Sequence, residues 1–116
     1  MGSQQVRMTA LWSVPRAEMW AISAAIQSIM VATRAEPGCI GCSLSTRLGE
    51  RAAFEYEEEW RTEDDLIVQL RSGRFTKLAH LIERATEQPQ IEFTLPGGTR
   101  GLEYAEEVRG TRGETH

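Results

Sequence analysis

The sequence has few of the side chains that bind metal ions or form disulfides. Its 116 residues include two cysteines and two histidines, and asparagine is absent. No run approaches the ~18 apolar residues of a membrane span. A balance of 13 basic against 17 acidic side chains gives no cationic stripe for a phosphate backbone. We therefore expect no metal site, no membrane partner and no nucleic-acid partner.

The start of the chain, MGSQQVRM, lacks the basic segment and apolar core of a secretory signal, so we expect a cytoplasmic protein. A length of 116 residues with 41% hydrophobic and 26% charged side chains fits one globular domain. We place this domain at residues 5–108. Residues 1–4 are expected to be a disordered N-terminus or tag remnant, and residues 109–116 a disordered tail, because they have nothing to bury.

The spacing of apolar residues predicts the order of the elements. Alternation indicates strands, and spacings of three and four indicate helices. The expected elements are a strand over 5–13, a helix over 16–35, a strand hairpin over 39–48 and 52–60, a helix pair between 62 and 88, a strand over 91–95 and a last strand over 102–108. This is the ferredoxin-like β-α-β-β-α-β order, an α+β fold with an antiparallel sheet and helices on one face.

The two cysteines, Cys39 and Cys42, have C-x-x-C spacing. On a regular strand they point to opposite faces with Cα atoms about 10 Å apart, beyond the ~7 Å limit of a disulfide. A redox dithiol sits before a helix, whereas the predicted helix precedes these cysteines. Zinc would need two more ligands. We therefore predict structural roles, with Cys42 a small core residue and Cys39 at the start of the strand.

The predicted third strand carries Phe54, Tyr56, Glu58 and Trp60 on one face. The apolar face of such a sheet packs against the helices, so these rings can simply belong to the core, with the polar atoms of Tyr56 and Trp60 at its rim. Glu58 is different, because a carboxylate on a buried face must be paired, hydrogen-bonded or protonated. Glu58 is therefore a candidate site residue.

The opposite face of this strand carries Glu55, Glu57 and Glu59. Arg7 and Arg47 lie on the polar sides of the neighbouring strands, so we expect the charges to be solvated or paired across strands. If this face packs against a second subunit, such pairs would set the register of the partner.

Two further groups on the predicted helices have a simple interpretation. His80 points away from the apolar stripe of its helix and is expected to be exposed. Arg71, Arg74 and Lys77 are expected to form a solvated face, with anion binding as the less favoured interpretation.

The order of elements and the segments EPGCIGCSL, FEYEEEWRTEDDL and RSGRF resemble the antibiotic biosynthesis monooxygenase family over residues 5–108. The markers are the P-G-C that opens the second strand, the E-x-W that ends the third (Glu58 and Trp60), and the S-x-x-F between the later helices (Ser72 and Phe75). The resemblance implies a dimeric α/β barrel made of two ferredoxin-like sheets.

The resemblance also implies a function. Some members oxygenate anthrones or quinols with O₂ and without a metal or flavin cofactor, and related members degrade haem. It implies a homodimer with a pocket lined by Phe54, Tyr56 and Trp60, in which the bound phenol loses a proton and the anion passes an electron to O₂. The protein then supplies a dry pocket, a proton acceptor and donors to the anion.

The chain departs from the family pattern at several positions. It lacks the asparagine that catalytic members often use, it has Gln69 where a histidine is often found, and it has Ala79 where haem degraders carry one. Since a glutamine cannot take a proton, the base would be Glu58 or a Tyr–Glu arrangement. The predicted catalytic residues are Glu58, Tyr56 and Trp60. The predicted substrate-binding residues are Phe54, Trp60, Gln69 and Trp12.

Three functions remain open at this point. The first is a cofactor-independent monooxygenase-like protein acting on an aromatic phenol or quinol, with O₂ as co-substrate. The second is a non-catalytic dimeric module that binds a small molecule, which the missing asparagine and histidine favour. The third is haem binding, for which we expect no Soret shift on titration with hemin.

Overall fold

The computed structural model describes residues 6–110. The predictions for residues 1–4 and for the tail beyond residue 110 lie outside the described residues. The domain predicted for residues 5–108 extends two residues further, because Arg109 and Gly110 complete the last helix.

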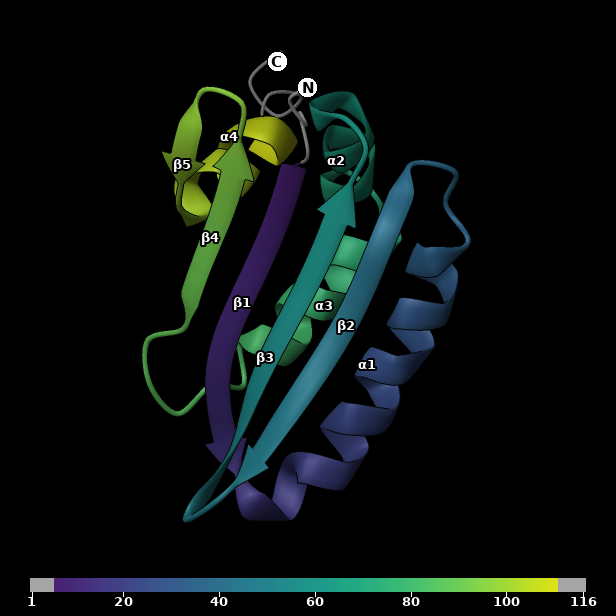
Figure 1. The fold of residues 1–116 in the computed structure, drawn as a ribbon. Helices are drawn as coiled ribbons and strands as arrows, with labels where there is room; N and C mark the ends of the chain where they lie inside the picture. Colours follow the sequence, from purple (N-terminus) through teal and green to yellow (C-terminus); the bar gives the residue numbers. More distant parts are fainter. Residues whose placement is uncertain (1–5, 111–116) are drawn as a thin grey trace.

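Five strands form a single antiparallel sheet (Figure 1). The strands are β1 (Val6–Pro15), β2 (Cys39–Leu48), β3 (Arg51–Trp60), β4 (Gln90–Leu95) and β5 (Gly98–Arg100). Their order across the sheet is β2-β3-β1-β4-β5, so β1 lies between β3 and β4. This is the predicted ferredoxin-like arrangement, with one short strand added at the edge.

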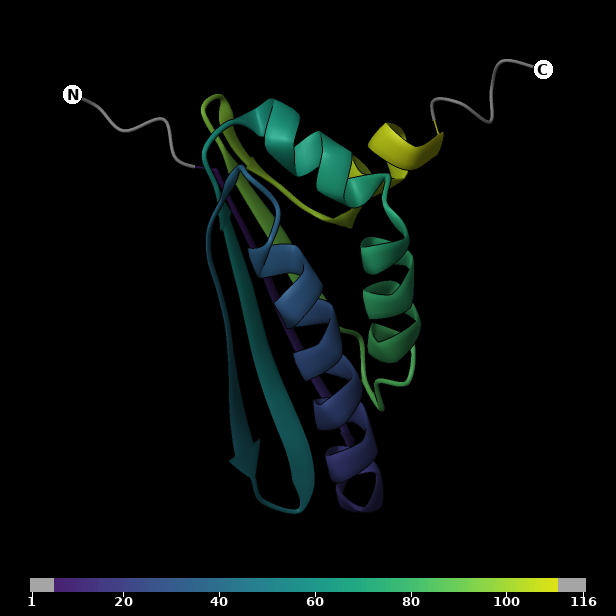
Figure 2. The same ribbon diagram turned by 90° about the vertical axis from the view of Figure 1, so that its right-hand side faces the viewer.

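The helices cover one face of the sheet, as predicted (Figure 2). A single 3₁₀ turn, η1 (Arg16–Glu18), leads into α1 (Met19–Arg34). The later helices are α2 (Glu63–Leu70), α3 (Gly73–Ile82) and α4 (Leu102–Gly110). None of the described helices is both long enough and apolar enough to cross a membrane.

Side-chain caps start α2 and α3 as two separate helices. The hydroxyl of Thr62 accepts a hydrogen bond from the Asp65 backbone N–H at 3.1 Å, and the hydroxyl of Ser72 accepts one from the Phe75 N–H at 3.4 Å. Three acidic residues follow Thr62 in the first turn of α2, where the helix dipole favours negative charge. The capping box predicted at residues 62–65 therefore marks the start of this helix.

The segment over residues 102–108 is a helix, and its prediction as a strand was wrong. Its buried residues are Tyr104, Ala105 and Val108. These spacings of one and three fit a helical turn rather than alternation. A short strand, β5, follows the turn after β4. It begins at Gly98, whose φ of 136° favours glycine. Tyr104 then packs on Phe93 of β4 with ring centroids 5.2 Å apart.

The start of β2 differs from the regular strand that the alternation predicted. A bulge between Cys39 and Gly41 shifts the register, so Cys39 lies opposite Trp60 and Cys42 lies opposite Glu58. Both cysteines therefore lie on the helix side of the sheet, which corrects the prediction of opposite faces. Both are free thiols, and Cys42 is buried.

Two apolar residues of β2 are exposed. Ile40 is 46% exposed and Leu48 is 49% exposed. Ile40 lies at the bulge, and Leu48 lies at the far end of β2, an edge strand of the sheet. Alternation therefore determined the burial of the central strands more reliably than that of this edge.

The outer face of the sheet carries the predicted charge pairs. Arg7 contacts Glu57 at 2.8 Å and Glu59 at 3.6 Å across the β1–β3 pair. Arg47 lies opposite Ala53 rather than opposite a glutamate. The inner face forms one apolar core, which includes the rings of Trp12, Phe54, Tyr56 and Trp60.

Candidate functional site

The third strand places a carboxylate at the centre of the core. Glu58 has no exposed surface. Its Oε2 accepts hydrogen bonds from the Tyr56 hydroxyl at 2.6 Å and from the Gln69 amide at 3.0 Å, and its Oε1 accepts one from the Trp60 indole N–H at 2.9 Å. Tyr56 and Trp60 reach it because they lie two positions away on the same face of β3.

This hydrogen-bonded group extends to both sides of Glu58. The Cys42 thiol donates to the Tyr56 hydroxyl at 3.3 Å, and the Gln69 amide lies 3.2 Å from the Thr33 hydroxyl. Arg74 Nε donates to Oε1, the side-chain amide oxygen of Gln69, at 2.8 Å. We refer to this group as the Glu58 cluster. Its members are Thr33, Cys42, Tyr56, Glu58, Trp60, Gln69 and Arg74.

Burial controls the proton affinity of the cluster. Desolvation raises the pKa of Glu58 above its ordinary value of 4.5, while the three donors and the positive charge of Arg74 act in the opposite direction. Desolvation and then the charge of Glu58 raise the pKa of Tyr56, and desolvation raises the pKa of the Cys42 thiol to about 11. The tyrosine and the thiol are therefore held in their protonated forms.

The cluster is closed to ligands in this structure. The three residues that donate to Glu58 are each at most 1% exposed: Tyr56, Trp60 and Gln69. Arg74 is also engaged, since its guanidinium contacts Glu36 at 3.3 Å. The arrangement therefore joins β3, β2, α1, α2 and α3 through polar contacts inside the core.

Trp12 and Phe54, two predicted substrate-binding residues, lie away from this cluster. They are opposite each other on β1 and β3, with ring centroids 5.3 Å apart. Four residues along a strand separate Phe54 from Glu58, a distance of about 13 Å. The structure therefore brings Glu58, Tyr56, Trp60 and Gln69 together and places Trp12 and Phe54 at the other end of the same face.

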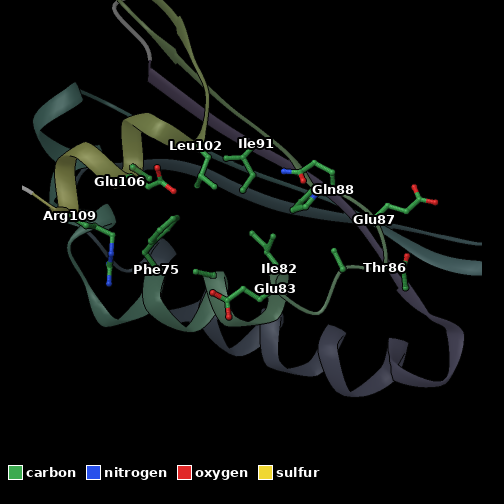
Figure 3. Close-up of a pocket in the computed structure, with 14 residues that line it drawn as sticks. Phe75, Ile82, Glu83, Thr86, Glu87, Gln88, Ile91, Leu102, Glu106 and Arg109 are labelled. Carbon is green, nitrogen blue, oxygen red and sulfur yellow. The ribbon is translucent and has the colours of Figure 1, made fainter.

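One hollow is a groove that the sequence did not predict (Figure 3). It lies between α3, α4 and the segment that leads into β4, and its volume is about 700 Å³. Its walls are mostly apolar. Fourteen residues line it, and we call it the α3–α4 groove: Phe75, Ala79, Ile82, Glu83, Ala85, Thr86, Glu87, Gln88, Pro89, Ile91, Leu102, Ala105, Glu106 and Arg109.

Polar side chains from α4 lie at one end of the groove. Figure 3 shows the Glu106 carboxylate pointing into the space between α4 and α3. The Arg109 guanidinium lies over the Phe75 ring, 5.5 Å from its centroid. Arg109 also donates to the Leu70 carbonyl at 2.5 Å and to the Thr76 hydroxyl at 2.8 Å, which fixes its position. Glu106 was missed because its segment was predicted as a strand, and Arg109 was missed because it was assigned to the disordered tail.

Two smaller hollows lie elsewhere in the described residues. One, of about 350 Å³, lies between α1 and α3 and includes Arg74 and Lys77. The other, of about 180 Å³, includes Trp12 and Phe54. Tyr56 and Trp60 line none of the three, so the pocket that the family resemblance implied beside them is not among these hollows.

The helical polar residues have mixed environments. His80 and Lys77 are exposed, as predicted. Arg71 is exposed as well, and its guanidinium donates to the Val108 carbonyl at 3.2 Å. Arg71 and Arg109 thus attach α4 to α2. Arg74 departs from the predicted solvated face, because it is half-buried and contacts Gln69 and Glu36. Among residues 6–110, no group of three or more acidic, histidine or cysteine side chains is placed to hold a metal ion.

The fold is shared with solved structures of small proteins. A candidate antibiotic biosynthesis monooxygenase from Nitrosomonas europaea is 14% identical, with a TM-score of 0.69 over 82% of this chain and 92% of that chain. Another from Caulobacter crescentus is 17% identical, with a TM-score of 0.68 over 78% and 88%. A conserved protein from Methanosarcina mazei is 22% identical, with a TM-score of 0.69 over 78% and 91%.

No family model matches the sequence, and no curated protein matches it. The identities to the solved structures are low, so these likenesses describe the fold. The resemblance to antibiotic biosynthesis monooxygenases is confirmed at that level: the chain has the ferredoxin-like α+β fold of those structures.

Proposed function

We propose that this chain is a cofactor-independent, monooxygenase-like protein that binds an aromatic phenol or quinol in the α3–α4 groove. The observation that carries the proposal is the groove itself. Its volume is about 700 Å³, its walls are mostly apolar, and a carboxylate and a guanidinium lie at one end. Small-molecule sites are typically of this size and composition. The shared fold with candidate monooxygenases supports the choice of reaction.

In this proposal the groove supplies the three requirements of the reaction. The apolar walls exclude water from the ring, Glu106 accepts the proton of the phenol, and Arg109 stabilises the resulting anion. The anion passes an electron to O₂, and the two radicals combine at carbon. With an anthrone as substrate, one oxygen atom enters the product as a carbonyl and the other leaves as water.

The predicted catalytic residues Glu58, Tyr56 and Trp60 have a different role in this proposal. Their cluster fixes Gln69 at the end of α2 and Arg74 at the start of α3. Arg109 binds the Leu70 carbonyl, next to Gln69, and Thr76 of α3. The Glu58 cluster therefore positions α2 and α3, the helices that hold Arg109. Its effect on a bound ligand is indirect, through the position of Arg109 in the groove.

The test is oxygen uptake with a panel of hydroquinones and anthrones in the presence of a metal chelator. We expect turnover by the wild type and a loss of about 10²-fold in Glu106→Gln, the usual effect of removing a general base. Glu50→Gln is the matched control, since Glu50 is exposed in the turn between β2 and β3 and does not line the groove. Absence of turnover by the wild type across the whole panel would reject the oxygenase proposal.

A second candidate function is a binding module without catalysis. One observation favours it: the Arg109 guanidinium already donates to the Leu70 carbonyl and to the Thr76 hydroxyl, so it is committed to protein acceptors. A phenol that binds in the groove, with no consumption of O₂, would support this function. Loss of binding in Ala79→Phe, which narrows the groove, would locate the ligand.

We also propose that the chain is a homodimer that packs through the outer face of the sheet. The charge pairs of Arg7 with Glu57 and Glu59 lie on this face, and Leu11 on the same face is 43% exposed. Such pairs can fix the register of a partner, and the apolar side chain provides area to bury. This proposal extends the dimeric barrel that the family resemblance implies.

A further inference from the structure

The α3–α4 groove has more acidic than basic groups on its walls. Its described lining includes three carboxylates, Glu83, Glu87 and Glu106, against one guanidinium, that of Arg109. Glu87 is paired with Arg51 outside the groove, so its charge is already neutralised. The two remaining carboxylates and the guanidinium leave an excess of one negative charge. A groove with this balance attracts a cationic ligand and repels an anionic one.

The carboxylates of Glu83 and Glu106 have no protein partner to displace. Neither makes a hydrogen bond or an ion pair with another side chain within residues 6–110. Arg84, the next residue after Glu83, pairs instead with Glu18 at 2.7 Å. A cation that binds in the groove can therefore contact these carboxylates without breaking an existing ion pair.

The position of Glu83 at a helix end also favours a cation. Glu83 is the C-cap of α3, where the last carbonyl groups of the helix have no partner within the helix and give this end a partial negative charge. A carboxylate at that end adds to the negative charge. The group that the helix end stabilises is a cation, such as a protonated amine.

The two polar ends of the groove are separated along α3. Phe75, under the Arg109 guanidinium, lies eight residues before Glu83, which corresponds to about 12 Å along the helix. Figure 3 shows Glu106 towards the Arg109 end and Glu83 further along the α3 wall. Ala79 lines the groove midway between Phe75 and Glu83, and its small side chain leaves room for a ring.

We propose that the preferred ligands of the α3–α4 groove are phenols or quinols that carry a protonated amine on a short alkyl arm. The ring packs beside Ala79, the hydroxyl faces Glu106 and Arg109, and the ammonium group pairs with Glu83. This inference rests on the proposed function for the place of the phenol, and it adds the charge that selects among phenols. The apolar groove makes the site, and the carboxylates select the charge of the ligand.

Three phenols that differ only in the end of the arm provide the test. Tyramine ends in an ammonium group, para-propylphenol in a methyl group and para-hydroxyphenylpropionate in a carboxylate. By isothermal titration at low salt we expect tyramine to bind more tightly than the propionate. Added sodium chloride should weaken the binding of tyramine and leave that of para-propylphenol unchanged. Equal affinities for the cationic and the anionic phenol would overturn the proposal.

Two variants of Glu83 test the proposed anchor of the amine. Glu83→Gln keeps the size and removes the charge, so we expect tyramine to bind about 2- to 5-fold more weakly, the usual contribution of an exposed ion pair. The affinity for para-propylphenol should not change. Glu83→Lys suits the end of a helix and should reverse the preference between tyramine and the propionate. Glu50→Gln, in the exposed turn between β2 and β3, is the control. Tyramine affinity that is the same in all these proteins would overturn the proposal.

A filling variant locates the ligand, and oxygen uptake separates this inference from the proposed function. Ala79→Phe narrows the groove and should abolish tyramine binding, and retained binding would place tyramine elsewhere and overturn the inference. Uptake with neutral hydroquinones but no preference for tyramine would overturn this inference alone. A Glu83-dependent preference for tyramine without uptake would support it and reject the oxygenase. Failure of all three phenols to bind would reject both proposals.

Discussion

At the scale of single residues, Glu58 shows how a buried charge is accommodated. Its carboxylate has no exposure and receives three donors. The sequence alone indicated that this acid on an apolar face had to be paired, hydrogen-bonded or protonated. The partner from another element, Gln69 on α2, became known only from the fold, because it is eleven positions away along the chain.

Replacement of Glu58 should destabilise the protein strongly. Glu58→Ala leaves the donors of Tyr56, Trp60 and Gln69 buried without an acceptor. We expect the free energy of unfolding to fall by about 3–5 kcal/mol, as when one partner of a buried charged contact is removed. Urea denaturation measures this change. Glu50→Ala in the exposed turn between β2 and β3 is the control, with an expected change within about 0.5 kcal/mol. Similar losses in both variants would contradict the role of the cluster.

Glu58 should also give stability a particular dependence on pH. Its folded-state pKa is raised above the ordinary value of 4.5 by burial, so the folded protein holds this proton at pH values where the unfolded chain has released it. The contribution of Glu58 to folding is therefore greatest at low pH, and it decreases as pH rises from about 4.5 through the folded-state pKa.

The measurement is the difference in unfolding free energy between the wild type and Glu58→Gln across this range. The amide introduced by this substitution does not titrate, so the difference isolates the proton of Glu58 from the other carboxyl groups. We expect the wild type to lose stability relative to the variant as pH rises. A difference that is constant with pH, or that grows in favour of the wild type, would show that the pKa of Glu58 is not raised.

At the scale of elements, capping and close approach determine where segments begin. Gly38 is the last residue before β2, and a Cβ atom there would lie 2.2 Å from the Asp65 side chain at the start of α2. The Gly38 carbonyl accepts from the Arg61 N–H at 2.9 Å. The glycine of the P-G-C marker therefore has a physical reason, which is the close packing of this loop on the α2 cap.

The cap of α2 can be tested directly. Thr62→Ala removes the hydroxyl that accepts from the Asp65 N–H at 3.1 Å. We expect a loss of about 1 kcal/mol in unfolding free energy, the usual effect of removing an N-cap. Thr62→Ser keeps the hydroxyl and should stay close to the wild type. Equal losses in both variants would show that the methyl group, and not the cap, contributes the stability.

At the scale of the whole molecule, the two faces of the sheet differ in what they contact. The inner face packs against the helices and holds the Glu58 cluster and the Trp12–Phe54 pair. The outer face carries charge pairs between β1 and β3. The α3–α4 groove lies on the helix side of the sheet, where α4 approaches α3 and the segment that leads into β4, and Ile91 of β4 is part of its lining (Figure 3).

The proposed homodimer predicts a mass. Light scattering at micromolar concentration should give about twice the chain mass of 13.0 kDa. Leu11→Arg places a charge on the outer face of the sheet and should reduce the measured mass towards that of one chain. Val31→Arg is the control, because Val31 is 69% exposed on α1, on the helix side. A wild-type mass of one chain would reject the dimer.

The sequence by itself determined the ferredoxin-like order, the inward face of β3, the cap of α2 and the burial of Glu58. Each of these depends on residues close together in the chain, where alternation, helical spacing and capping chemistry operate. Tertiary structure alone decided the contacts between distant segments. The bulge turned both cysteines to one face, residues 102–108 became a helix because Tyr104 and Ala105 pack together on the sheet side, and the groove arose where α4 meets α3. No local pattern encodes such contacts, because they depend on which surfaces the completed fold brings together.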